Sequence, residues 1–210
     1  MVQMRSRLKN HGIAFAHPHF RINGKSVKAG LSQHAHNGSR IDPKTEDEAM
    51  DEVALPLVAN MLKFVQVEDT NLNDLVNAEE TIMKQMLFIR ETKDLIDSHS
   101  SNRYLVAETH NATTLLATLY FAKLNGVDDI VDISPLFEDG PGVDNAISIM
   151  TKMFQNEDFV NYVRRNPETQ YRLQQVLAVE FGYSDISRFE GTIPSGAYNE
   201  KAKSGLLNAI

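Results

Sequence analysis

The stretch Val179–Glu190, with the sequence VEFGYSDISRFE, decides how the rest of the chain is interpreted. A short apolar run ends at Gly182, and Asp185 follows shortly after it at the start of a polar turn. This pattern predicts a buried strand whose C-terminal end presents a carboxylate to a loop.

A second stretch has the same layout. Ile130–Asp139, IVDISPLFED, is an apolar run that delivers Glu138 at its end, and a helical pattern separates it from the first stretch. Strand ends of α/β proteins meet at one face of the sheet, so Glu138 and Asp185 are expected to lie near each other. Two carboxylates suit Mg²⁺ or Mn²⁺. The alternative is that each acid caps the helix that follows it.

Two further strands are expected upstream, at Gly12–Asn23 and Asn102–His110. The second is followed by an amphipathic helix over 111–124, which Asn125 and Gly126 end. Strands that alternate with helices of this length imply parallel βα units within a single domain, residues 1–210.

Helical spacing also fills residues 41–100, with Pro56 marking a kink or a break. We interpret this segment as a helical insertion of two or three helices between the first and second strands. Gly24–Arg40 is predicted to be a loop or a short helix, and helices are predicted over 143–165 and 195–210.

Four strands with their crossovers amount to about half of an eight-stranded barrel. A parallel sheet must be covered on both faces or closed on itself. The chain is therefore either a small open α/β domain with a helical insertion or part of a larger (β/α)8 TIM-type barrel.

The composition is that of one globular domain: 210 residues, 42% hydrophobic, 23% charged, with a formal net charge of −7. The acidic balance argues against broad binding of nucleic acid or anionic membranes. The absence of cysteine excludes thiol catalysis and disulfides. No membrane span or signal peptide is evident in the sequence, so we expect a cytoplasmic protein.

Two histidine pairs, His17 with His19 and His34 with His36, have a spacing that places both rings on one face of a strand. Together they could make a zinc site, but no third-ligand motif of the HExxH type accompanies them. We favour histidines in loops or at the rim of a site.

Arginines follow or flank the predicted strands at Arg21, Arg103 and Arg188. Such arginines can bind an oxyanion with two parallel hydrogen bonds. No P-loop, GxGxxG or GxSxG motif occurs. The residues by themselves indicate a site for a divalent metal and an oxyanion.

Four motifs resemble segments of the phosphoenolpyruvate carboxylase family, in order and with about the same spacing: HFRIN (His19–Asn23), RYLVAE (Arg103–Glu108), DISPLFED (Asp132–Asp139) and FGYSDISRFEG (Phe181–Gly191). The PLFE and GYSD elements are the most specific of them. The resemblance covers nearly all of this chain but only the middle part of the much longer family chain.

The resemblance implies a (β/α)8 barrel with a large helical elaboration, in a cytoplasmic and usually tetrameric lyase. Such enzymes fix carbon for the tricarboxylic acid cycle, converting phosphoenolpyruvate and bicarbonate to oxaloacetate and phosphate with Mg²⁺ or Mn²⁺. Glu138 and Asp185 match the two metal-ligand carboxylates, and Arg21 matches an arginine that helps hold the substrate. Arg188 stands where the family usually has a lysine.

Departures from the family pattern affect what this chain can do alone. The upstream catalytic-histidine motif and the downstream Gly/Arg-rich loop are absent, although the reaction needs a base and a lid. Arg188 keeps the charge of the lysine but not its capacity to deprotonate. We therefore expect a fragment or degenerate relative that is inactive by itself and associates with copies of itself or with missing parts of the same enzyme.

Two alternatives stay open. The first is a non-catalytic α/β binding or interaction module that retains the strand-end carboxylates. The second is a different metal-dependent lyase or aldolase on a similar barrel.

Overall fold

The computed structural model describes residues 19–34, 41–42, 46–67, 81–95, 102–164, 177–182 and 192–209. The strands in these ranges are β1 (His19–Asn23), β2 (Asn102–Ala107), β3 (Val131–Phe137) and β4 (Glu180–Phe181). The helices are α2 (Gly24–His34), α3 (Asp47–Val53), α4 (Leu55–Phe64), α6 (Thr81–Leu95), α7 (Ala112–Leu124), α8 (Gly140–Gln155), α9 (Glu157–Val163) and α11 (Thr192–Ala209).

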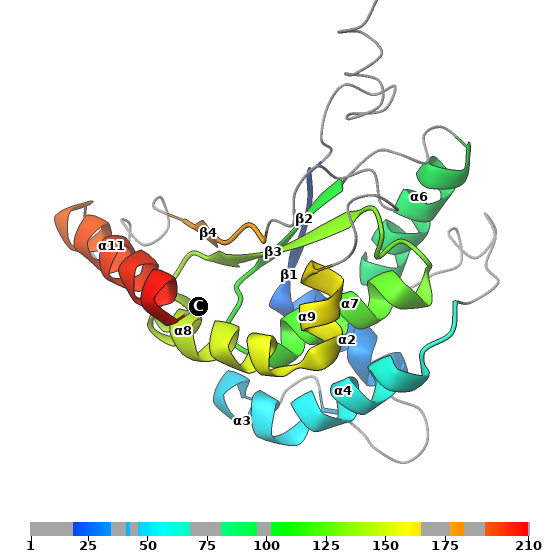
Figure 1. The fold of residues 1–210 in the computed structure, drawn as a ribbon, viewed down its shortest axis with the longest axis horizontal. Helices are drawn as coiled ribbons and strands as arrows, with labels where there is room; N and C mark the ends of the chain where they lie inside the picture. Colours follow the sequence, from blue (N-terminus) through cyan, green and yellow to red (C-terminus); the bar gives the residue numbers. More distant parts are fainter. Residues whose placement is uncertain are drawn as a thin grey trace, which may run out of the picture.

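The strands form one parallel sheet in the order β1-β2-β3-β4. Figure 1 shows α2, α7, α8 and α9 on one side of this sheet, with α3 and α4 farther from it. A doubly wound sheet reverses its strand order at a switch point, whereas successive units of a barrel lie side by side. The order observed is consistent with a partial α/β barrel.

The helix after β2 has the predicted bounds but not the predicted polar face. Every residue of α7 except Lys123 is buried, because the helix is packed among β3, α2, α4, α6 and α8. Its buried threonine hydroxyls have hydrogen-bond partners: that of Thr118 donates to the carbonyl of Thr114 at 2.9 Å, and that of Thr113 donates to Oδ1 of Asp51 on α3 at 2.9 Å. The prediction of an amphipathic helix was wrong because helices cover α7 on the side away from the sheet.

The segment 41–100 contributes α3, α4 and α6 to this outer cover. The break predicted at Pro56 is confirmed, since α3 ends at Val53 and Pro56 lies in the first turn of α4. Of the two possibilities for Gly24–Arg40, the helix is confirmed, and α2 extends over eleven residues.

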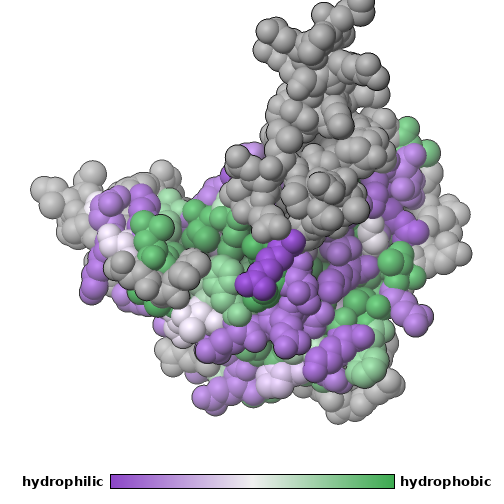
Figure 2. All heavy atoms as spheres, viewed as in Figure 1, coloured by the Kyte–Doolittle hydropathy of each residue, from purple (hydrophilic) through white to green (hydrophobic). Residues whose placement is uncertain are grey.

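The helical segment predicted over 143–165, with a new helical turn expected at Asp158, is two helices, and the second begins at Glu157. Asn156 interrupts it, and its side chain accepts the backbone N–H of Phe159 at 3.0 Å, which caps the start of α9. None of the helices in the described ranges is long and apolar enough to cross a bilayer. Figure 2 shows hydrophobic side chains gathered between α11 and the rest of the molecule on the face viewed.

Candidate functional site at the carboxyl edge of the sheet

Arg21 and Glu138 meet across the sheet at its carboxyl edge. Arg21 lies on β1 and Glu138 directly follows β3, so β2 lies between their strands. Nη2 of Arg21 donates to both carboxylate oxygens of Glu138, at 2.8 Å and 2.6 Å. The Glu138 side chain is 10% exposed, whereas that of Arg21 is 58% exposed. The sheet therefore presents a nearly buried carboxylate next to an accessible guanidinium.

The strand between them also contacts this carboxylate. The backbone N–H of Glu108, which directly follows β2, donates to Oε1 of Glu138 at 3.3 Å. Glu108 has φ +52°, in the left-handed region that non-glycine residues rarely adopt. Such conformations cluster at functional sites.

The chain after β4 approaches the same residue from the other side. Gly182 donates its N–H to the carbonyl of Phe137 at 2.8 Å. A Cβ atom on Gly182 would lie 2.6 Å from Cβ of Glu138, so a side chain there would collide with it. Asp185 and Arg188 follow Gly182 in the sequence and lie outside the described residues.

Asp139, and not Glu138, caps the helix that follows β3. Oδ1 of Asp139 accepts the N–H of Gly142 at 2.9 Å, at the start of α8. The alternative in which Glu138 caps this helix is therefore wrong, and the Glu138 side chain faces Arg21 instead.

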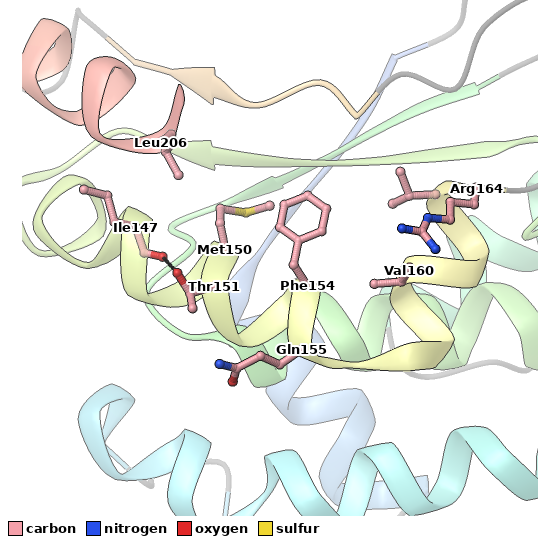
Figure 3. A pocket seen from close by; sticks show the side chains of 9 residues that line it. Ile147, Met150, Thr151, Phe154, Gln155, Val160, Arg164 and Leu206 are labelled. Carbon is pink, nitrogen blue, oxygen red and sulfur yellow. Dashed lines mark hydrogen bonds between the residues drawn. The ribbon is translucent and has the colours of Figure 1, made fainter. Parts of the chain in front are cut away.

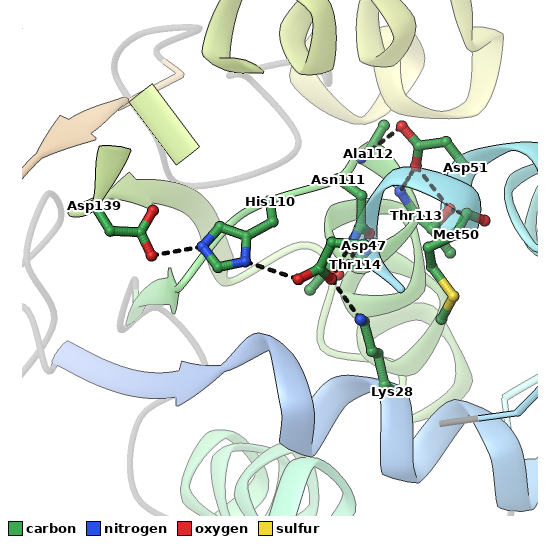
Figure 4. Close-up of polar contacts among 10 residues, drawn as sticks. All are labelled: Lys28, Asp47, Met50, Asp51, His110, Asn111, Ala112, Thr113, Thr114 and Asp139. Atoms are coloured by element: carbon green, nitrogen blue, oxygen red, sulfur yellow. Dashed lines mark hydrogen bonds and ion pairs between the residues drawn. The ribbon is translucent and has the colours of Figure 1, made fainter. Parts of the chain in front are cut away.

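Asp139 leads into a polar network, which we call the His110 clamp and define as Asp139, His110, Asp47, Lys28 and Asn111 (Figure 4). Nε2 of His110 lies 2.6 Å from Oδ2 of Asp139, and Nδ1 lies 2.9 Å from Oδ2 of Asp47. The other oxygen of Asp47 accepts from Nζ of Lys28 and, at 2.9 Å, from Nδ2 of Asn111. The clamp joins α2, α3 and the loops after β2 and β3.

Charge inside the clamp favours a protonated histidine. The pKa of His110 is raised to about 9, chiefly by its hydrogen bond with Asp139. Burial of the ring lowers this pKa, but the hydrogen bond with Asp47 raises it further, and the net shift is upward. The hydrogen bond from His110 lowers the pKa of Asp139. Burial opposes ionisation of Asp47, but hydrogen bonds from Lys28 and His110 outweigh it and lower its pKa. Both ring nitrogens of His110 therefore donate at neutral pH.

The family model for phosphoenolpyruvate carboxylase matches residues 62–207, well over half of the chain. The chain belongs to the phosphoenolpyruvate carboxylase family. The match contains Glu138, Asp185 and Arg188, whereas Arg21 precedes it.

Two curated family members illustrate the extent of the similarity. The phosphoenolpyruvate carboxylase of Prochlorococcus marinus is 29% identical over 138 residues, which are 63% of this chain and 13% of that protein. That of a Synechococcus species is 26% identical over 131 residues, 60% of this chain and 12% of that protein. The chain thus spans about an eighth of the length of these phosphoenolpyruvate carboxylases.

At this edge the described residues of the chain supply one carboxylate of the kind that a hard divalent cation prefers. Glu138 offers the carboxylate oxygens that Mg²⁺ and Mn²⁺ prefer, and Mg²⁺ is commonly held by one or two carboxylates plus water and substrate oxygens. Within the described ranges no three His, Asp or Glu residues form a group that could hold a metal. Further protein ligands would have to come from segments such as the one that contains Asp185.

The other polar candidates from the sequence have different surroundings. The ring of His34 packs edge-on against Phe121, with 5.3 Å between ring centroids. Nη1 of Arg103 lies 3.3 Å from Glu180, so this arginine pairs with a carboxylate on β4. His17 and His36, the other members of the two histidine pairs, lie outside the described residues.

A cavity of about 390 Å³ lies between α8, α9 and α11, away from this edge (Figure 3). Its lining is largely apolar: Ile147, Met150, Thr151, Phe154, Gln155, Val160, Val163, Arg164 and Leu206. Among the described residues that line it there is no carboxylate and no histidine.

Proposed function

We propose that this chain is the metal-binding central portion of a phosphoenolpyruvate carboxylase. In a complete enzyme it would serve the carboxylation of phosphoenolpyruvate by bicarbonate, giving oxaloacetate and phosphate. The observation that carries the proposal is the buried Glu138 carboxylate at the carboxyl edge of the sheet, beside Arg21. Active sites of (β/α)8 enzymes are built at this edge.

Glu138 and Asp185 are the proposed ligands of Mg²⁺ or Mn²⁺. Gly182 contacts Glu138, and only two residues separate it from Asp185, which supports a short path between the two carboxylates. When bound, the cation would neutralise negative charge on the phosphate and on the enolate oxygen.

Arg21 is the proposed substrate-binding arginine. Its side chain is accessible, and a planar guanidinium can bind a phosphate or carboxylate through two parallel hydrogen bonds. In the structure it neutralises Glu138, so binding of the cation would release it toward the substrate. Arg188 is proposed to supply a second fixed positive charge for the same substrate, and not to act as a base.

A closed (β/α)8 barrel, a cytoplasmic location and a homo-oligomeric or multi-chain assembly complete the proposal. The edge strands β1 and β4 present backbone groups to which further strands could add. Nucleic acid and membrane surfaces are not proposed as partners, because the chain is acidic.

The test is a titration of Mn²⁺ into the purified chain, followed by the paramagnetic relaxation of water protons. Glu138→Gln and Asp185→Asn remove one charge each with little change of shape, and both should abolish saturable binding. Asp129→Asn is the matched control, because Asp129 precedes β3 at the opposite edge of the sheet and pairs with Lys93. Binding that survives both substitutions would refute the metal site.

The second candidate is a non-catalytic module that keeps the strand-end carboxylates. The pairing of Glu138 with Arg21 favours it, because a carboxylate that is already neutralised does not require a cation. A chain that folds, binds no Mn²⁺ and forms a stable complex with a protein other than a carboxylase would support this candidate.

A further inference from the structure

The His110 clamp lies directly beside the proposed metal ligand without containing it. We infer that His110 is a positioning residue for Glu138: by holding Asp139, it fixes the backbone turn from which the Glu138 carboxylate projects, and so sets the affinity of this edge for a divalent cation. This inference rests on the proposed function and adds a residue to it.

Asp139 is the point of connection, because it is joined to Glu138 by a peptide bond and each of its carboxylate oxygens has a separate donor. Oδ1 accepts the N–H of Gly142 and Oδ2 faces Nε2 of His110, at 2.9 Å and 2.6 Å. With both oxygens engaged, the side chain is held in one orientation. Its backbone, and the direction of Glu138 with it, is restrained accordingly.

The start of α8 approaches this contact closely. A Cβ atom on Gly142 would lie 2.9 Å from Oδ1 of Asp139 and 3.5 Å from Cδ2 of His110. The start of α8 therefore packs directly against the carboxylate and the ring. A shift of His110 would move Asp139 and the first turn of this helix together.

The far side of the ring is anchored equally well. Asp47, near the start of α3, faces Nδ1 of His110 and is itself held by Lys28 and Asn111. On this side the ring is thus held by Asp47, whose carboxylate is itself fixed by Lys28 and Asn111. Loss of a second-layer contact to a metal ligand commonly costs ~10- to 100-fold in metal affinity. His110 acts through the residue next to the ligand, so we expect an effect at the lower end of this range.

Two amide substitutions separate a positioning role from a merely structural one. The amide nitrogen of Gln is as many bonds from Cα as Nε2 of His, so His110→Gln can keep the contact with Asp139 and lose that with Asp47. The amide nitrogen of Asn corresponds in the same way to Nδ1, so His110→Asn keeps Asp47 and loses Asp139. Each variant loses one hydrogen bond and keeps the other with a neutral amide donor, so the two should lose stability to a similar degree.

The experiment measures Mn²⁺ affinity by water-proton relaxation in the full chain, wild type and both variants, with urea unfolding of each. We expect His110→Gln to bind within about two-fold of wild type and His110→Asn to bind roughly ten-fold more weakly. Asp139→Asn, which keeps a capping oxygen but turns an N–H toward Nε2, should resemble His110→Asn and serves if that variant does not fold.

Equal Mn²⁺ affinity in wild type, His110→Asn and Asp139→Asn would overturn the inference and leave the metal site intact. Equal weakening in His110→Gln and His110→Asn would also overturn it, because affinity would then follow stability alone. Absence of Glu138-dependent binding in the wild type would overturn the proposed function and this inference together.

Discussion

Gly182 lies against Glu138 so closely that a Cβ atom added to the glycine would be 2.6 Å from Cβ and 3.1 Å from Cα of the glutamate. The N–H of Gly182 also donates to the carbonyl of Phe137, the residue before Glu138. The chain at the end of β4 is therefore hydrogen-bonded to the last residue of β3, which directly precedes the candidate metal ligand Glu138. Contact between these two positions fixes where the segment with Asp185 begins.

Replacing Gly182 with alanine should push the chain after β4 away from Glu138. Overpacking of this kind typically costs about 1 to 3 kcal/mol. The free energy of unfolding measured in urea titrations should therefore fall by that amount. On the proposed function Mn²⁺ affinity should fall as well, because Asp185 follows Gly182 with only two residues between them. Gly196→Ala is the control, since a Cβ atom there would meet nothing within 4 Å. Equal stability of the two variants would contradict this account.

Removal of the charge of Arg21 should strengthen cation binding in the absence of substrate. The guanidinium occupies both oxygens of Glu138 and repels a second cation. Arg21→Gln should therefore bind Mn²⁺ roughly five-fold more tightly, which corresponds to about 1 kcal/mol in a partly exposed site. Arg103→Gln, in which the lost partner is Glu180, should leave the affinity near that of wild type. A lower affinity in Arg21→Gln would show that the arginine supports the metal site directly.

The stability of the fold should decline with alkaline pH because of His110. Its pKa is raised from 6.5 to about 9 by Asp139 and Asp47, so its contribution is complete below pH 6.5 and is lost as the pH rises through 9. We expect a loss of about 1 to 2 kcal/mol across this range, allowing for partial solvent screening. Urea titrations between pH 6 and 10 measure it.

His110→Gln is the matched control for this pH dependence, because an amide does not titrate. Lys28, Asp47 and Asp139 are present in both proteins, so the difference between the two curves isolates the titration of the imidazole. A wild-type curve as flat as that of the variant would contradict a protonated His110.

At acid pH the stability of the fold should change in the opposite direction. The pKa values of Asp139 and Asp47 are lowered, so both carboxylates contribute stability that is lost as the pH falls through their folded-state values.

The order of strands and helices was predictable from local signals. The apolar runs that end at Ala107 and Phe137 are strands β2 and β3, and Asn125 with Gly126 follows the end of α7 as predicted. These features depend on a few neighbouring residues. The resemblance of the motifs to phosphoenolpyruvate carboxylases is equally local, and the match of the family model confirms it.

The contacts that form the candidate site were harder to foresee. Arg21 and Glu138 are 117 residues apart, and the sequence indicated only that each follows or lies on a strand. Their pairing depends on the parallel order of three strands and on the register that places Arg21 opposite Leu105. The roles proposed for Asp185 and Arg188 stay predictions, since both lie outside the described residues.

His110 gave no signal in the sequence at all, because it is a single histidine without a spaced companion. Its partners, Asp47 and Asp139, come from a helix and a loop on either side of it in the chain. A local signal does exist for Asp139, because an acid followed by proline in the first turn is typical of a capped helix start. Nothing local could have identified the histidine that holds it.

Asp51 connects α3 to the helices α7 and α8. The carboxylate lies in the interior, where it accepts the backbone N–H groups of Ala112 and Thr113, at 3.2 Å and 2.8 Å, and the hydroxyl of Thr113 at 2.9 Å. Lys152 on α8 also donates to it at 2.9 Å. One side chain from the 41–100 segment thus caps α7 and contacts α8.

Asp51→Ala should lower the free energy of unfolding by about 2 to 3 kcal/mol, because it leaves buried donors at the start of α7 unpaired. Lys152→Met should cost no more than about 1 kcal/mol, since the Lys152 side chain is 42% exposed and its ion pair is partly solvated. Circular dichroism and the fluorescence of the tyrosines should report one transition in both variants. A separate early transition of the α3–α4 region in Asp51→Ala, with the remaining stability unchanged, would mean that the segment folds independently of the sheet and its helices.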